Sequence, residues 1–308
     1  MKNTDWLKLL GLAVLWGGTF FFQSLSLRIW PTFTIVFFRV FFAAVVFWLI
    51  VLVTRQSVPR ERRVWLAFLV MGLINNAIPF TLITWEQTHV EGGVASIINA
   101  TASCFAVVFA HFLTRDEKLT VRRVLGVTVG LLGAYVLLRP EMDGGITARG
   151  LGEMAGLVAA MSLALAGIFG KRFRNQSPVV TATGMLTCSS LLMLPLVVVF
   201  DKPWVLDVEI ASMAPIAGLV LLSTVLAYLL YFSILRSAGA TNLLLVTLLM
   251  PVTAHILGAA FLDEPLYASS VVGMLFVVTG LSIIDGRVVR RVRGLTSPHG
   301  EHADEGST

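Results

Sequence analysis

Residues 114–120 read TRDEKLT, and residues 261–267 read FLDEPLY. The second stretch begins 147 positions after the first, and each places an Asp-Glu pair between two apolar segments. The same offset relates further residues on both sides of the two pairs: Gly92 and Gly239, Leu119 and Leu266, Gly126 and Gly273, and Gly133 and Gly280. A pattern that keeps its register over so long a distance predicts an internal repeat.

The composition predicts a membrane protein. Of the 308 residues 56% are hydrophobic and 13% are charged, against about 25% charged in an ordinary soluble domain. A hydrocarbon layer about 30 Å thick needs roughly 20 apolar residues per helix. We therefore predict an all-α polytopic membrane protein with ten transmembrane helices, at about 6–27, 33–54, 64–85, 92–113, 121–138, 150–170, 179–200, 212–235, 240–262 and 266–284.

The basic residues predict the orientation of these helices. If the N-terminus lies inside, 18 of the 23 Lys and Arg residues fall on the inner side. The outer connections hold only Arg28, Arg139, Arg149 and Lys202. Because Lys and Arg in short loops resist translocation, both termini are expected to be cytoplasmic in a multi-pass protein of the cell (inner) membrane. Basic residues scattered among loops favour membrane lipid, and not nucleic acid, as the partner.

An odd number of spans in each repeat decides the relation between the halves. Five spans in 1–145 and five in 146–285 make the second repeat inverted, because it begins on the opposite side of the membrane. Asp116-Glu117 would then lie at the cytoplasmic face and Asp263-Glu264 at the outer face. The polar residues 286–308 are expected to form a disordered cytoplasmic tail.

Several short motifs follow one another in the order of a known family. They are Trp16-Gly17, Pro31, Arg39, Gly92, Asp116-Glu117-Lys118-Leu119-Thr120, Gly126 and Gly133, and then Gly239, Pro251, Glu264, Gly273 and Gly280. In these features the sequence resembles a ten-helix member of the drug/metabolite transporter superfamily with two EamA-type repeats, over most of residues 10–285. The resemblance implies transport of small metabolites, often export of amino acids or toxic compounds.

Polar residues near the middle of a span are candidates for substrate contact, because they are costly in hydrocarbon. We expect binding by Trp16, Thr19, Asn75, Asn76, Asn99, Tyr228 and Tyr231. Each has a structural alternative: the asparagines could join helices, Trp16 could fill space, and the tyrosines could belong to a packed face. Asn75 and Asn76 point about 100° apart on a helix, so at most one faces a cavity squarely.

Four residues are candidates for coupling or gating. Pro79 and Pro251 lack an amide hydrogen, so in a regular helix they free the carbonyls of Asn75 and Thr247. His255 is the only histidine near the middle of a span and could carry a proton or stay neutral.

Arg39 is the fourth candidate. It lies within a span, where it could extend to the lipid headgroups or take a gating or anion-binding role.

The carboxylates are placed differently. All 18 Asp and Glu residues fall at span ends, in loops or in the tail, with Glu86 and Glu153 nearest to a span. No buried carboxylate relay is therefore visible, and coupling would use His255, a carboxylate at a helix end, or nothing.

The leading functional hypothesis is a secondary transporter that exports small metabolites such as amino acids by alternating access. A uniporter or channel-like facilitator and a multidrug exporter remain alternatives. An intramembrane enzyme is disfavoured, because the metal, nucleophile and paired-aspartate motifs of such enzymes are missing. No cofactor or metal is expected. The partners are a small-molecule substrate and lipid, and the protein is expected to be a monomer or a weak homodimer.

Overall fold

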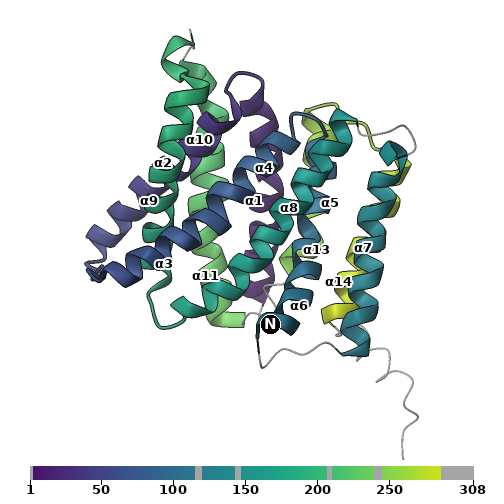
Figure 1. Cartoon of the computed structure of the whole chain (residues 1–308), viewed down its shortest axis with the longest axis horizontal. Helices are drawn as coiled ribbons and strands as arrows, with labels where there is room; N and C mark the ends of the chain where they lie inside the picture. The colour runs from purple at the N-terminus through teal and green to yellow at the C-terminus, as the bar shows by residue number, and fades with distance from the viewer. Residues whose placement is uncertain (1–2, 115–119, 143–146, 207–209, 239–244, 286–308) are drawn as a thin grey trace, which may run out of the picture.

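The computed structural model describes residues 3–114, 120–142, 147–206, 210–238 and 245–285, which are helical with short connections (Figure 1). The pair Asp116-Glu117 and the predicted tail lie outside the described residues. The main helices are α1 (Asn3–Leu27), α2 (Thr32–Val53), α3 (Arg62–Gly72), α4 (Ile78–Glu86), α5 (Gly92–Ala100), α6 (Ala102–Leu113), α7 (Val121–Met142), α8 (Ala148–Gly170), α9 (Pro178–Leu196), α10 (Ala214–Val220), α11 (Ala227–Ala238), α13 (Leu245–Phe261) and α14 (Ala268–Asp285).

Among the described residues, seven helices or joined helical runs are long and apolar enough to cross a membrane: Asn3–Leu27, Thr32–Val53, Arg62–Glu86, Gly92–Leu113, Ala148–Phe173, Pro178–Asp201 and Ala214–Ile234. Two further helical stretches, Val246–Phe261 and Ala268–Ile284, are apolar but shorter. The structure is therefore that of a polytopic helical membrane protein, and the predicted segments 33–54 and 179–200 coincide with two of its runs to within a residue.

Among the described residues, three joined runs contain a widened turn in the π-helical pattern; one of these turns, Val197–Asp201 (η3), follows α9, and the other two lie between helices. Leu73–Ala77 (η1) lies between α3 and α4, and Leu221–Leu226 (η6) lies between α10 and α11. The turn η6 begins 148 residues after η1, close to the offset of the acidic pairs. Turns of this kind are rare in helices and often accompany functional sites. The same backbone irregularity thus occurs at equivalent places in the two halves.

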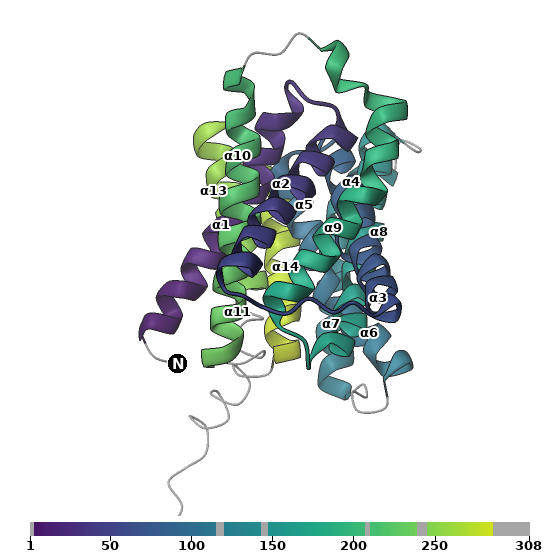
Figure 2. The same ribbon diagram turned by 90° about the vertical axis from the view of Figure 1, so that its left-hand side faces the viewer.

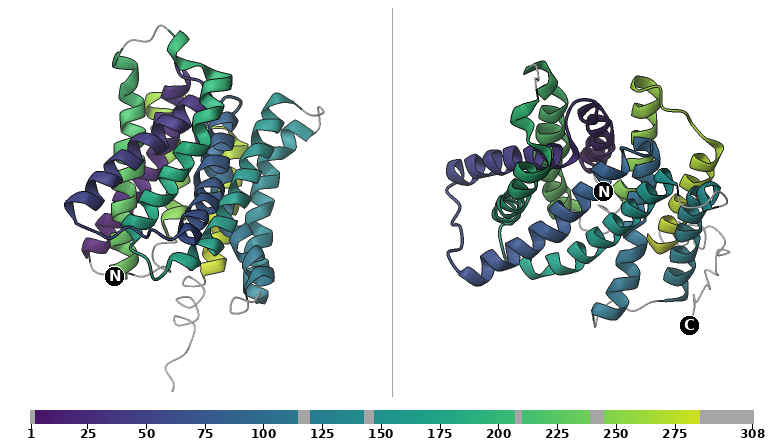
Figure 3. Two further views of the ribbon diagram at one scale, coloured as in Figure 1. Left: turned by 60° about the vertical axis from the view of Figure 1, so that its left-hand side comes forward. Right: turned by 45° about the horizontal axis from the view of Figure 1, so that its top comes forward.

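The helix packing has a matching symmetry. α2 packs along α9, and Figure 2 shows α2 between α9 on one side and α10–α11 on the other. α1 packs on α13 and on α10–α11, while α8 packs on α5–α6 and on α4. α7 and α14 form a pair at one edge of the bundle, teal and yellow in both views of Figure 3.

Glycines let α7 and α14 approach closely. A Cβ added at Gly126 would lie 2.7 Å from the Gly280 carbonyl oxygen, and one at Gly133 would lie 2.7 Å from the Gly273 carbonyl oxygen. The two helices are therefore antiparallel. Under the repeat offset Gly126 corresponds to Gly273 and Gly133 to Gly280, so one contact becomes the other when the halves are exchanged. This is the relation that a two-fold axis between the helices produces.

The connections gather at two ends of the bundle. At one end, Lys8 Nζ donates to Ser233 Oγ at 2.9 Å, and Ser177 Oγ donates to Gln56. We call this the basic end, because these connections carry most of the Lys and Arg residues.

At the opposite, acidic end, Asp201 accepts hydrogen bonds from the backbone and hydroxyl of Thr34 at 2.6 and 2.9 Å. An ion pair joins Glu91 and Arg149 at the same end. Each of these contacts joins segments that the charge pattern predicts on the same side of the membrane.

Candidate functional site

A cavity of about 720 Å³ lies inside the bundle. Its inner wall comes from α1, α2, η1, α4, α5 and α6, and from α8, α9, α11 and α13. It reaches the basic end, where Lys171, Arg174 and Gln176 in the connection between α8 and α9 line it. The predicted residues among its lining are Trp16, Thr19, Arg39, Asn75, Asn99, Tyr228 and Tyr231.

Helix α1 supplies Trp16 and Thr19 to the wall. The Trp16 ring lies 5.7 Å from the Tyr231 ring, centroid to centroid, so an aromatic pair from the two halves faces the cavity. The next residue, Gly17, faces α13, where a Cβ would collide with Thr253. The hydroxyl of Thr253 donates to the Ala13 carbonyl at 2.9 Å. The small Gly17 therefore brings α1 against α13 and directs Trp16 into the cavity.

The neighbouring Asn75 and Asn76 have different positions. Asn75 lines the cavity, and its amide donates to Asn76 Oδ1 at 2.9 Å. Asn76 is buried, and its amide donates to Ser189 Oγ on α9 at 3.0 Å. Asn76 therefore joins two helices and does not line the cavity.

Pro79 lies just after the widened turn η1. In the widened turn the Ile78 amide bonds the Leu73 carbonyl, five residues back, so the next carbonyl, that of Ile74, is the one that faces Pro79. Ser162 on α8 donates to that carbonyl at 2.7 Å. A side chain of the other half thus bonds the backbone beside Pro79, at the widened turn.

Arg39 is buried and points inward, so the alternative that it extends to the lipid headgroups is wrong. It is 6% exposed, and its Nε donates to Thr224 Oγ1 in η6 at 3.0 Å. Its guanidinium carbon lies 3.8 Å from the centre of the Phe80 ring. A cation over an aromatic face is stabilised by the ring quadrupole. Thr224 of η6 and Phe80 of α4, one from each half, therefore hold Arg39 between them at the cavity wall.

The charged side chains among the described residues that line the cavity are all basic. Arg39, Lys171 and Arg174 are cationic, and no Asp or Glu is among the described residues that line it. Asn99 lies on the wall as well, and its buried Oδ1 accepts no hydrogen bond from the described residues. The cavity thus offers a guanidinium for an anionic group, with the carboxamide of Asn99 on its wall.

His255 and Pro251 lie outside the cavity lining. The Nδ1 of His255 contacts the Pro251 carbonyl oxygen at 2.9 Å, which makes this nitrogen a donor. The ring packs against Gly93, where a Cβ would lie 2.9 Å from it. Thr247, whose carbonyl was expected to be freed, does line the cavity.

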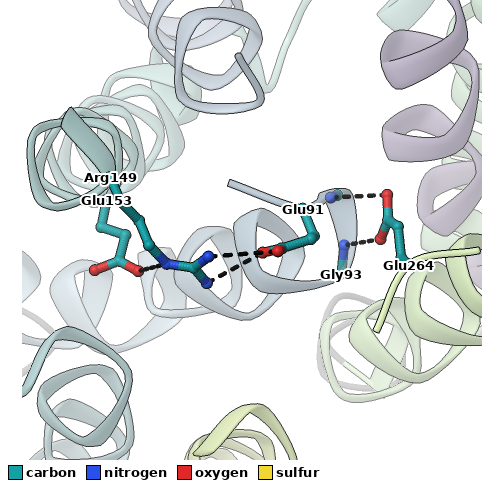
Figure 4. A network of polar contacts seen from close by, with 6 residues as sticks. Glu91, Gly93, Arg149, Glu153 and Glu264 are labelled. Atoms are coloured by element: carbon teal, nitrogen blue, oxygen red, sulfur yellow. Dashed lines mark hydrogen bonds and ion pairs between the residues drawn. The ribbon is translucent and has the colours of Figure 1, made fainter. Parts of the chain in front are cut away.

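A polar network closes the acidic end (Figure 4). The carboxylate of Glu264 accepts hydrogen bonds from the backbone N–H groups of Gly92 and Gly93, at 3.1 and 3.2 Å. These are the first residues of α5, where free amides and the helix dipole favour a negative charge. Arg149 lies between Glu91, at 3.1 Å, and Glu153, at 3.4 Å. Each interaction crosses from one half of the chain to the other, except the pair of Arg149 with Glu153.

Sequence reasoning missed a buried carboxyl group beside this network. Glu86 has no exposed surface and Glu153 has 1%. Glu86 ends α4 and contacts α8 at Gly156, where a Cβ would collide with its carboxyl oxygens. The signal in the sequence was the position of both glutamates next to predicted spans, and the glycines at 152 and 156 that let α8 approach α4.

The family of the chain follows from comparison with known proteins. The model of the EamA-like transporter family matches residues 6–139 and again residues 150–284, so the chain belongs to this family. The two matches correspond to the two halves in which the packing pairs and widened turns recur.

Individual relatives are distant but match over most of their length. The chain is 22% identical to the transporter YoaV of Bacillus subtilis (strain 168), over 89% of this chain and 94% of YoaV. It is 24% identical to a protein of Escherichia coli (strain K12) named "Probable amino-acid metabolite efflux pump", over 92% of this chain and 95% of that protein. It is also 24% identical to the inner membrane transporter YedA of the same strain, over 84% and 83%.

A solved crystal structure shares the fold. It superposes with a TM-score of 0.68, covers 94% of this chain and 99% of its own, and is 18% identical in sequence. The relatives are named as transporters and not as enzymes. The chain is therefore a multi-pass membrane transporter of the EamA-like family.

Proposed function

We propose that the protein is a secondary transporter of the inner membrane that exports amino acids or similar zwitterionic metabolites by alternating access. The carrying observation is the cavity, which is lined by buried Arg39 and by Asn99 and has no Asp or Glu among its described lining residues. A carboxylate would pair with Arg39, and an ammonium group would donate to Asn99. An apolar or aromatic side chain would pack on Trp16 and Tyr231.

The architecture in this proposal has ten spans in two inverted repeats, 1–145 and 146–285, with both termini cytoplasmic. The two-fold relation of the glycine contacts between α7 and α14 supports it, and so does the recurrence of the widened turn. The gathering of predicted inner connections at one end and outer connections at the other supports the orientation.

In this orientation the structure corresponds to an inward-facing state. The cavity reaches the basic, cytoplasmic end, and the network of Glu264, Arg149 and Glu91 closes the outer end. Transport requires a second state in which the outer network opens and the connection between α8 and α9 closes, as inverted repeats allow. A channel-like facilitator would not need this exchange. The relative named as an amino-acid metabolite efflux pump supports export of that substrate class.

A counterflow experiment tests the proposal. Purified protein in liposomes preloaded with one unlabelled amino acid should accumulate the labelled form of that amino acid from outside, across a panel of candidates. Trp16→Ala and Asn75→Ala should reduce the accumulation while the elution profile of the folded protein stays unchanged. Counterflow requires a carrier, so its absence with simple equilibration of the label would favour the facilitator. Preference for bulky cations without a carboxylate would favour a multidrug exporter.

A further inference from the structure

Glu86 is placed where an ionised carboxylate is unfavourable. It has no exposed surface, and neither of its oxygens has a hydrogen-bond partner among the described residues. A carboxylate without donors or a counter-ion in a low-dielectric interior is strongly destabilised relative to water. A protonated carboxyl avoids most of this cost. The carboxyl group of Glu86 occupies the space beside Gly156 of α8 that any larger residue would fill.

The surrounding charges also favour a proton on Glu86. The elements packed against α4 are α8, α5, α2 and η1. Helix α8 carries Arg149 and Glu153, and Glu91 directly precedes α5. Arg149 contacts Glu91 and Glu153, so its guanidinium is already paired with two other carboxyl groups.

The other ionisable groups near α4 do not supply the missing cation. Neither α5 nor η1 contains a titratable residue. Arg39 of α2 lies against Phe80, two turns before Glu86. His89 follows Glu86 in the chain, but its ring contacts that of Trp85 in a tilted arrangement and its Nδ1 contacts the Trp85 carbonyl oxygen. Two carboxylates that share a buried site do not both ionise readily.

We propose that Glu86 is a proton-binding site of the outer gate: closing the acidic end binds a proton at Glu86, and opening it releases that proton to the outer solution. Only the role of Glu86 in a transport cycle rests on the proposed transport function. The binding of a proton on closure does not depend on it. Glu86 and Glu153 lie on α4 and α8, which pack against each other, and the Arg149–Glu91 pair of Figure 4 joins α8 to the segment that follows α4. In this proposal, opening of the network separates α4 from α8. Hydration would then stabilise the carboxylate. Opening is therefore favoured by high external pH and opposed by external acid.

Cysteine accessibility tests the linkage directly. Val90→Cys places a thiol that is buried between α4 and α5, and Thr88→Cys places an exposed one two residues away. Both belong in a background with Cys104→Ala and Cys188→Ala. The ratio of the two labelling rates in purified protein removes the pH dependence of the thiol itself. It should rise by up to about tenfold per pH unit where the proton is released, as one linked proton requires.

The variants separate the proton site from general structural effects. Glu86→Gln imitates the protonated form, so the ratio should stay low and lose its pH dependence. Glu61→Gln, which changes an exposed carboxyl group at the start of α3, should retain the wild-type profile. A wild-type pH dependence that survives in Glu86→Gln would overturn the proposal. So would a dependence on sodium concentration at constant pH, which would indicate a metal ion as the ligand.

A spectroscopic measurement needs no transport assay and no change in accessibility. The infrared spectrum of the purified wild-type protein in deuterated buffer at pH 7 should contain the carbonyl stretch of a protonated carboxyl group. This band should be missing in Glu86→Gln and should return, slightly shifted, in Glu86→Asp. Its absence from the wild type would refute the proposal even if Glu86→Gln fails to fold. Failure of every counterflow assay would instead affect only the proposed function.

Discussion

The joined runs α3–η1–α4 and α10–η6–α11 have equivalent backbones and different side chains. Both contain a widened turn near the middle, and both pack beside α2 or α9 and against a long helix, α8 or α1. The first turn contains Asn75 and Asn76, whereas the positions 147 residues later are Leu222 and Ser223. The repeat has therefore kept the irregular backbone but not the two carboxamides.

The difference separates two tasks. Two halves with the same backbone can exchange their conformations with each other, as alternating access requires. Recognition of one small solute needs different groups on its different sides, and these cannot be symmetric. The same division occurs elsewhere: Arg39 corresponds to the apolar Leu186, and Asn99 corresponds to Val246. We therefore expect substitutions at the asymmetric positions to change substrate handling, and substitutions at the symmetric ones to change stability and gating.

We expect the largest loss of transport from a substitution of Arg39. Arg39→Ala should reduce counterflow of amino acids by about 100-fold, because charge-assisted hydrogen bonds in a buried site contribute about 1.5–3 kcal/mol. Initial rates in liposomes measure it. Leu186→Met, at the corresponding position of the second half, should leave the rates within about twofold. Equal losses in both variants would mean that Arg39 acts through packing and not through the substrate.

Asn99 should show a smaller and more selective effect. Asn99→Leu removes the acceptor for an ammonium group, so the half-saturating concentration of an amino acid should rise about tenfold, as loss of one such hydrogen bond implies. Competition by the matching carboxylic acid without the amino group should be unchanged. Val246→Ala, the counterpart, should alter neither value. Weaker competition by both ligands in Asn99→Leu would contradict the proposed contact.

The symmetric glycines should respond alike. Gly126→Ala and Gly273→Ala each force a Cβ against backbone or a packed side chain of the facing helix, and overpacking of this kind costs about 1–3 kcal/mol. The midpoint temperature of thermal unfolding in detergent should fall by a similar amount in the two variants. Gly167→Ala is the matched control, because a Cβ there meets nothing within 4 Å. A large loss in one variant and none in the other would argue against the two-fold relation.

The sequence predicted the positions of helices better than the directions of side chains. Apolar length alone predicted the segments 33–54 and 179–200 to within a residue, and a polar residue at midspan was enough to predict that Asn75 and Asn99 lie on a cavity wall, because hydrocarbon excludes such groups from the lipid face. The widened turn could not be found in this way, since Pro79 removes one hydrogen bond whichever register the helix adopts. The burial of Arg39 depends on Thr224 and Phe80, which lie far away in the sequence. Glu86 was misjudged for the same reason, since its burial comes from close packing of α8 at Gly156.

The smallest expected effect concerns the closed end. Glu264→Gln removes the charge that caps α5 and leaves one acceptor for two backbone N–H groups, a loss of about 1 kcal/mol. The closed outer end should therefore open about fivefold more often, and labelling of Val90→Cys relative to Thr88→Cys should rise by that factor.

Asp263→Asn is the neighbouring control for this prediction. Asp263 is exposed and has a positive φ of 55°, a conformation that asparagine adopts readily, so the backbone should be preserved. If both variants raise labelling equally, the effect comes from the charge of the loop and not from the cap. If only Glu264→Gln does so, the hydrogen bonds to Gly92 and Gly93 hold the two halves together at the outer end. Opening would then depend on two separate local events, release of this cap and loss of a proton from Glu86. Labelling of a variant that changes both residues shows whether the two free-energy changes add, as independent events require, or are coupled.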